Sequence, residues 1–116
     1  MRYMMIIHHD DEALAQAPQQ ELWTEYAAFN QALEKAGDGF SSGQRLTGAK
    51  GATVVRSRAG KTEVLDGPYA DTREQLAGYF FIEVPTIEEA VEWANRCPST
   101  KYGTVEIRPI VEPGAS

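Results

Sequence analysis

The chain has 116 residues, of which 42% are hydrophobic and 24% charged, and its formal net charge is −6. This composition is typical of one soluble globular domain. Because the balance is acidic and no run of basic residues occurs, a nucleic-acid surface is excluded, and we expect neither DNA nor RNA as a partner.

Cys97 is the only cysteine, so no internal disulfide can form, which fits a reducing compartment. It stands just before Pro98, at the end of a helical pattern, and we interpret it as a small buried hydrophobe rather than a nucleophile. The apolar run at residues 3 to 7 is too short for a signal peptide, and no stretch reaches the length of a membrane span. We therefore predict a cytoplasmic protein with no membrane partner.

The first elements follow from periodicity. Residues 2 to 8 form a continuous apolar run, typical of a strand covered on both faces. Residues 10 to 17 are expected to be loop or a loose helical turn. Pro18 suits a helix start, and Gly37 closes the helix. Apolar residues at spacings of 4, 3, 4 and 3 make this helix amphipathic: Leu22, Tyr26, Phe29, Leu33 and Ala36.

The middle of the chain is less regular. Residues 39 to 46 predict a weak strand interrupted by glycine, and residues 47 to 51 lack periodicity and indicate a flexible loop. Residues 52 to 58 and 61 to 65 predict two strands. A tight turn at Ala59-Gly60 joins them into a hairpin.

A forced turn follows the hairpin. Gly67 can adopt a positive φ and Pro68 lacks an amide hydrogen, so the second strand cannot continue through them. We then expect a short helix that ends at Gly78, and a strand over residues 79 to 84. Side chains suited to capping this short helix are those of Asp71, Thr72, Glu74 and Gln75.

The last third of the chain has clear helix and strand signals. Thr86 and Glu89 form a capping box at the start of a second long helix. Its apolar stripe consists of Ile87, Ala90, Val91, Ala94 and Cys97. Residues 104 to 111 predict the final strand, and residues 113 to 116 a frayed tail.

This order predicts an α+β, ferredoxin-like fold. Two split β-α-β units make an antiparallel sheet with both long helices on one face, plus an inserted hairpin and a short helix. In strand 79 to 84, Tyr79 and Phe81 point to one face, while Phe80 and Ile82 point to the other. Because both faces are apolar and helices cover only one, we expect a homodimer.

Several segments in fixed order resemble one family. They are D-G-P-Y (66 to 69), E-Q-L-A-G-Y (74 to 79), E-E-A-V-E-W-A (88 to 94), C-P (97 and 98) and V-E-I-R-P (105 to 109), with M-R-Y-M-M-I-I at the start. The chain resembles the YCII-related family, in the branch named for a D-G-P-F motif. The resemblance implies a single domain over residues 1 to 112 and a dimeric α+β barrel built from two facing sheets.

Candidate chemistry centres on two histidines, His8 and His9, followed by Asp10 and Asp11. Neighbouring strand residues face opposite ways, so each face receives two of these four side chains. With no second cluster at ligand spacing, we expect no metal, and without a P-loop or dinucleotide fingerprint we expect no cofactor. The alternative interpretation is a polar strand end in which Asp10 or Asp11 caps the next turn.

An acid–base role is the sharper hypothesis. The family resemblance implies a His–Asp pair in the barrel cleft, but the helix at residues 19 to 36 has no histidine, so His8 is the candidate proton carrier. Asp66, at a strand end in the D-G-P-Y motif, is the candidate base or orienting carboxylate. It could equally be a turn residue that bonds its own backbone. Tyr69 and Tyr79 are the candidate ligand-binding residues.

We therefore expect a homodimer that binds a small organic molecule in a barrel cleft and acts on it by proton transfer or elimination. The alternative is a non-catalytic dimeric module that senses a ligand or accompanies another protein. The resemblance does not choose between the two: some family members are associated with alternative sigma factors, which makes a regulatory accessory role reasonable.

Overall fold

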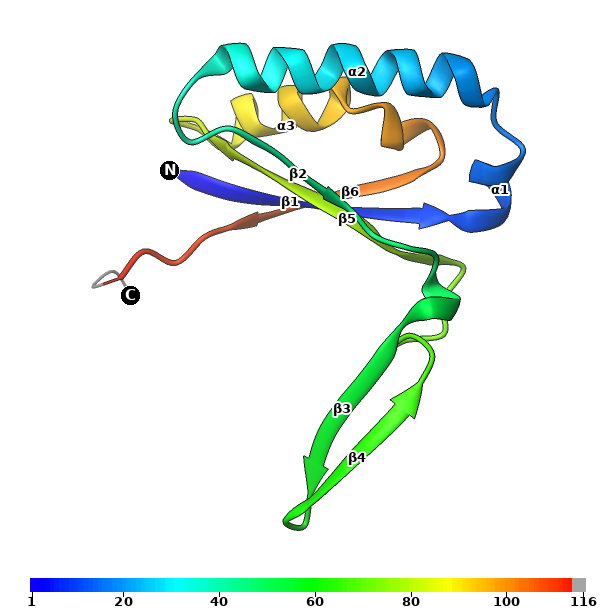
Figure 1. The fold of residues 1–116 in the computed structure, drawn as a ribbon. Coiled ribbons are helices and arrows are strands. Elements are labelled where there is room, and N and C mark those ends of the chain that lie inside the picture. Colours follow the sequence, from blue (N-terminus) through cyan, green and yellow to red (C-terminus); the bar gives the residue numbers. More distant parts are fainter. Residues whose placement is uncertain (114–116) are drawn as a thin grey trace.

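The computed structural model describes residues 1–113, and the rest of the predicted tail lies outside the described residues. Its body is a four-stranded antiparallel sheet in the order β2-β5-β1-β6, with helices α2 and α3 on one face (Figure 1). This confirms the predicted ferredoxin-like fold. In chain order the elements are β1 (Arg2–Asp10), α2 (Gln19–Ala36), β2 (Ser41–Arg45), β5 (Glu74–Glu83), α3 (Ile87–Arg96) and β6 (Gly103–Pro109).

Smaller elements connect these strands and helices. They are α1 (Asp11–Ala15), the 3-10 turns η1 (Ala49–Gly51) and η2 (Pro98–Lys101), and the strands β3 (Thr53–Arg58) and β4 (Lys61–Asp66). Strands β3 and β4 form a separate two-stranded sheet, which we call the arm, and it projects from the body on the side away from the helices (Figure 1). Ala59 and Gly60 both have positive φ, as a tight hairpin turn requires.

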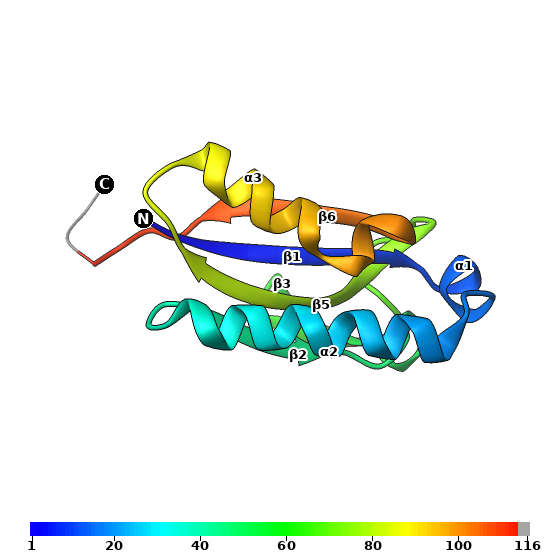
Figure 2. The ribbon, with the colours of Figure 1, turned by 90° about the horizontal axis from the view of Figure 1, so that it is seen from above.

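The core lies between the sheet and the two helices. Seen from above, α2 runs along the β2 side of the sheet and α3 along the β6 side (Figure 2). Buried side chains alternate along β1 with half-buried ones, which places every second residue under the helices. The buried cluster consists of Tyr3, Met5, Ile7, Phe29, Leu33, Phe80, Ile82, Val84, Ala90, Ala94 and Cys97.

Two predicted helix caps are confirmed. The Asp10 carboxylate accepts hydrogen bonds from the backbone amides of Glu12 and Ala13, at 3.1 and 3.3 Å, and so begins α1. The Thr86 hydroxyl accepts from the Glu89 amide at 3.3 Å and begins α3.

The short helix predicted before Gly78 is wrong. Strand β5 already begins at Glu74, because β1 extends to Asp10 and pairs with this segment. The polar residues that indicated a cap hold a bend instead: the Gln75 amide donates to the carbonyls of Ala70 and Thr72, at 2.8 and 2.7 Å. Pairing with a long neighbouring strand outweighs a local helix signal.

A β-bulge interrupts β2. Ser41 pairs with Phe81 and Gln44 with Tyr79, so β2 contains one residue more than β5 over this interval. Gly43 occupies the bulge with φ of +63°, and a Cβ atom there would lie 1.8 Å from the Tyr79 carbonyl oxygen. Only glycine combines this backbone conformation with this close approach.

We predict that Gly43→Ala destabilises the fold far more than Gly60→Ala. Both glycines have positive φ, which costs an alanine about 1–2 kcal/mol. At Gly60 a Cβ meets open space, whereas at Gly43 it meets backbone. Urea denaturation of the two variants measures the difference, and equal losses of unfolding free energy would contradict the bulge geometry.

Candidate functional site

A cavity of about 270 Å³ opens between α2 and the sheet. Its buried lining is mostly apolar and comes from four elements, including Leu22 and Phe29 of α2 and Phe80 of β5. Its outer edge includes Trp23, which is 70% exposed. A cavity with an apolar lining and a solvent-exposed entrance is the usual form of a small-molecule site.

His9 is the buried polar side chain among the residues that line this cavity. It follows Tyr3, Met5 and Ile7 on the helix-facing side of β1, and it is only 5% exposed. Within residues 1–113, neither of its ring nitrogens has a hydrogen-bond partner. Buried polar atoms are nearly always paired, so two free nitrogens beside a cavity indicate that a ligand or water completes them.

The surroundings of His9 favour its neutral form. Burial lowers the pKa of His9 from its ordinary value of 6.5, and the charge of Arg45 lowers it further. Asp11 and Glu74 act in the opposite direction but more weakly. At neutral pH, His9 therefore presents one nitrogen that can accept a proton.

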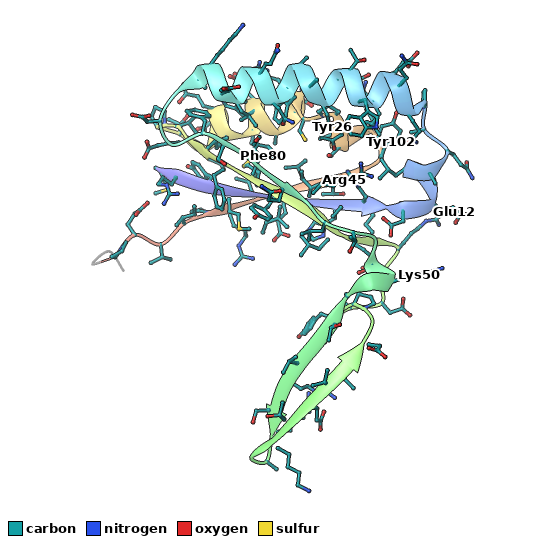
Figure 3. All side chains as sticks on the ribbon, in the orientation of Figure 1. Glu12, Tyr26, Arg45, Lys50, Phe80 and Tyr102 are labelled. Carbon is teal, nitrogen blue, oxygen red and sulfur yellow. The ribbon has the colours of Figure 1, made fainter. Side chains whose placement is uncertain are left out.

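Arg45 reaches the cavity because of the bulge in β2. It pairs with Gly78, which in turn pairs with Ile7, so all three lie on the helix-facing side of the sheet. Without the extra residue at Gly43, the alternation of β2 would turn Arg45 to the opposite face. The labelled Arg45 lies in the space between α2 and the sheet (Figure 3).

Other polar groups at the cavity keep their protons. The Tyr26 hydroxyl contacts the hydroxyl of buried Ser99. Burial raises the pKa of Tyr26 above its ordinary value. Burial likewise raises the pKa of Cys97, which is a free, buried thiol. A thiol held in its protonated form is a poor nucleophile, in agreement with the sequence interpretation.

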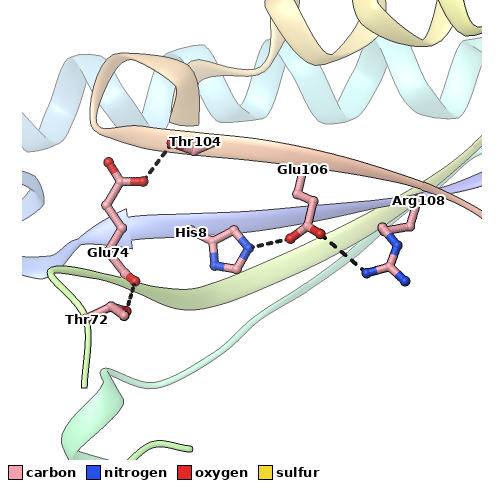
Figure 4. A network of polar contacts seen from close by, with 6 residues as sticks. All are labelled: His8, Thr72, Glu74, Thr104, Glu106 and Arg108. Carbon is pink, nitrogen blue, oxygen red and sulfur yellow. Dashed lines mark hydrogen bonds and ion pairs between the residues drawn. The ribbon is translucent and has the colours of Figure 1, made fainter. Parts of the chain in front are cut away.

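His8 lies on the opposite face of the sheet, which we call the open face. Its Nε2 atom lies 3.0 Å from Glu106, whose other oxygen accepts from Arg108 at 3.4 Å (Figure 4). The hydrogen bond from His8, and then that from Arg108, lower the pKa of Glu106. The Thr104 hydroxyl donates to Glu74 at 2.6 Å nearby. The carboxylate beside His8 is therefore Glu106.

The remaining predicted site residues lie apart from the cavity or only at its border. Asp66 is exposed at the end of the arm strand β4, opposite Thr53, and its side chain makes no hydrogen bond within residues 1–113. Tyr69 is 89% exposed. Tyr79 borders the cavity, but its ring packs against Phe81 on the open face, with 5.7 Å between ring centroids. Roles for these residues remain predictions.

Sequence reasoning weighed both histidines and chose His8 as the candidate, and it did not consider Arg45. The alternation along β1 separates the two histidines, but both of its faces are apolar, so the sequence does not show which one faces the helices. A glycine within a weak strand, Gly43, was the available signal for a bulge. The bulge in turn decides where Arg45 points.

Neither a metal site nor a membrane-spanning helix is found among the described residues. No group of three or more His, Cys, Asp or Glu side chains in residues 1–113 is arranged to hold a metal ion. None of the helices in that part of the chain has the length and hydropathy needed to cross a membrane.

Comparison with known proteins places the chain in a family. The family model described as "YCII-related domain" matches residues 1–113. An uncharacterized protein of Rhizobium meliloti (strain 1021) is 31% identical, over 95% of this chain and 92% of its own length. A solved structure of 5-chloro-2-hydroxyhydroquinone dehydrochlorinase from Burkholderia phenoliruptrix AC1100, in complex with 2,5-dihydroxybenzoquinone, covers all of both chains with a TM-score of 0.57. At 12% identity this structural likeness shows the fold alone. The family match and the curated relative show that this chain belongs to the YCII-related family.

Proposed function

We propose that this protein binds a small organic molecule in the cavity beneath α2 and catalyses proton transfer from it, with His9 as the proton acceptor. The observation that carries the proposal is the buried imidazole of His9, with both nitrogens unpaired within residues 1–113, at a cavity of about 270 Å³. A structural histidine would be expected to bond its surroundings.

The chemistry requires a neutral base in a site that holds little water. Neutral His9 takes a proton from a substrate carbon, and the electrons of that C–H bond enter a new C=C bond. In a simple proton transfer the adjacent carbonyl becomes an enolate; in an elimination a leaving group departs with its bonding pair. The imidazolium then returns its proton to the product or to solvent. The fold-level neighbour named as a dehydrochlorinase is consistent with the second course.

His8 and Asp66 stay as the alternative acid–base residues. His8 has a carboxylate partner in Glu106, which would orient its ring. It faces the open side of the sheet, however, and it does not line the cavity beneath α2. A non-catalytic sensing role also stays open, because the same cavity could bind a ligand without changing it.

We predict that ligands of the cavity exchange a carbon-bound proton with solvent. A thermal-shift screen of common metabolites identifies binders. Proton NMR in D₂O then measures deuterium incorporation into each one. We expect exchange with the parent protein and a loss of about a hundredfold or more in His9→Gln, as for removal of a general base. Because the neutral form is active and its pKa is lowered, the rate should rise with pH, pass its midpoint below pH 6.5 and then level off.

The control is His8→Gln, which removes the other imidazole. Retained exchange in this variant supports His9 as the base. Loss of exchange in His8→Gln, with normal exchange in His9→Gln, would assign the chemistry to the open face. Ligands that bind without any exchange would favour the sensing role.

We propose further that two copies associate through their open faces. Met4, Ile6, Tyr79 and Phe81 give this face a half-buried apolar centre within one chain. The arm projects on the same side and carries Val55 and Val64, which are 63% and 64% exposed. A lone two-stranded hairpin is marginally stable in water, so contact with a second copy would stabilise the arm.

We predict that light scattering of the purified protein gives twice the mass of one chain at micromolar concentration. Phe81→Lys should shift it to the monomer, because a charge replaces apolar surface at the centre of the open face. The matched control is Val91→Lys on α3, which is 51% exposed on the helix side and should leave the mass unchanged. A parent protein that is monomeric under these conditions would disprove the association.

A further inference from the structure

Arg45 has no ionic partner within residues 1–113. Five ion pairs occur among these residues, and none includes it, nor does its guanidinium donate a hydrogen bond there. Arg45 is exposed to solvent and lines the cavity, so its charge is accessible to a ligand that enters there. Its position depends on a glycine bulge that turns it toward the helices.

The buried part of the cavity lining is mostly apolar. Leu22, Phe29 and Phe80 are buried and line the cavity, so a charged group of a ligand placed against them would lose its hydration without a partner. A ligand that fills the space must therefore carry an apolar body. At about 270 Å³ the cavity lies near the lower limit for ligand pockets, which restricts that body to a single ring or a short chain.

We propose that the cavity selects small organic anions, with the carboxylate or enolate oxygens of the ligand on Arg45 and its apolar body between α2 and β5. This inference rests on the proposed function, since it names the substrate class of the same site. A guanidinium suits these oxygens because its planar fork donates two parallel hydrogen bonds to a carboxylate.

The same arrangement explains how His9 and Arg45 act together. As neutral His9 takes a proton from carbon, negative charge develops on the substrate oxygen. The Arg45 cation beside that oxygen stabilises the charge as it forms. Asp11 and Glu74, the carboxylates whose charges also reach His9, favour the imidazolium that results. Arg45 thus serves both the recognition of the anion and the proton transfer.

The test uses benzoate and benzamide, which share one ring and nearly one shape but differ in charge. Isothermal titration of the full-length protein measures both. We expect benzoate to bind at least tenfold more tightly than benzamide, and Arg45→Gln to weaken benzoate binding about tenfold while leaving benzamide unchanged. Arg45→Lys keeps the charge without the fork and should recover part of the loss. Arg58→Gln, on the exposed turn side of the arm, removes the same charge elsewhere and should have no effect.

The outcomes separate this inference from the proposed function. Equal binding of benzoate and benzamide, unaffected by Arg45→Gln, would overturn the preference for anions and leave a neutral-ligand site intact. Binding of neither probe would overturn the inference for ring-sized anions, and the metabolite screen would then decide the proposed function alone. Circular dichroism shows whether Arg45→Gln is folded. If it is not, Arg45→Lys is compared with the parent protein instead. A preference for benzoate over benzamide that is the same in Arg45→Lys as in the parent would count against a role for the planar guanidinium.

Discussion

The structure depends on one strand that is apolar on both of its faces. Strand β1 lies between β5 and β6, so both of its edges are paired, and both of its faces carry apolar side chains. Helices α2 and α3 cover one face, over Tyr3, Met5 and Ile7. The alternation that buries these residues continues to the strand end and carries His9 under α2 and His8 to the open face. The two candidate sites thus lie on opposite faces of the same strand.

Small irregularities turn this scaffold into a site. The bulge at Gly43 adds one residue to β2 and brings Arg45 to the helix-facing side. Gly78, opposite Arg45, allows a close approach of β2, because a Cβ atom there would lie 2.7 Å from the Gln44 carbonyl oxygen. Strand β5 has an irregularity of its own where it pairs with Ile7 and His8. Departures from a regular ladder therefore cluster beside the cavity, as they often do at functional sites.

The sequence predicted the scaffold better than the site. Periodicity identified α2 and α3, and the capping box at Thr86 and Glu89 located the start of α3. Local signals failed where tertiary pairing decided the outcome: the polar residues before Gly78 looked like a helix start, yet they precede a long strand that pairs with β1. Which histidine faces the helices, and where Arg45 points, depend on pairing register, and a one-residue slip in register reverses every side chain.

If the proposed function is correct, ligands bind beside His9 rather than on the open face. Long-range ¹H–¹⁵N correlation spectra resolve the imidazoles of His8 and His9, the chain's two histidines, and His8→Gln assigns the signals. In a titration with benzoate at neutral pH, we expect the His9 nitrogens to shift with ligand concentration while those of His8 stay unchanged. A titration in which His8 shifts and His9 does not would contradict it.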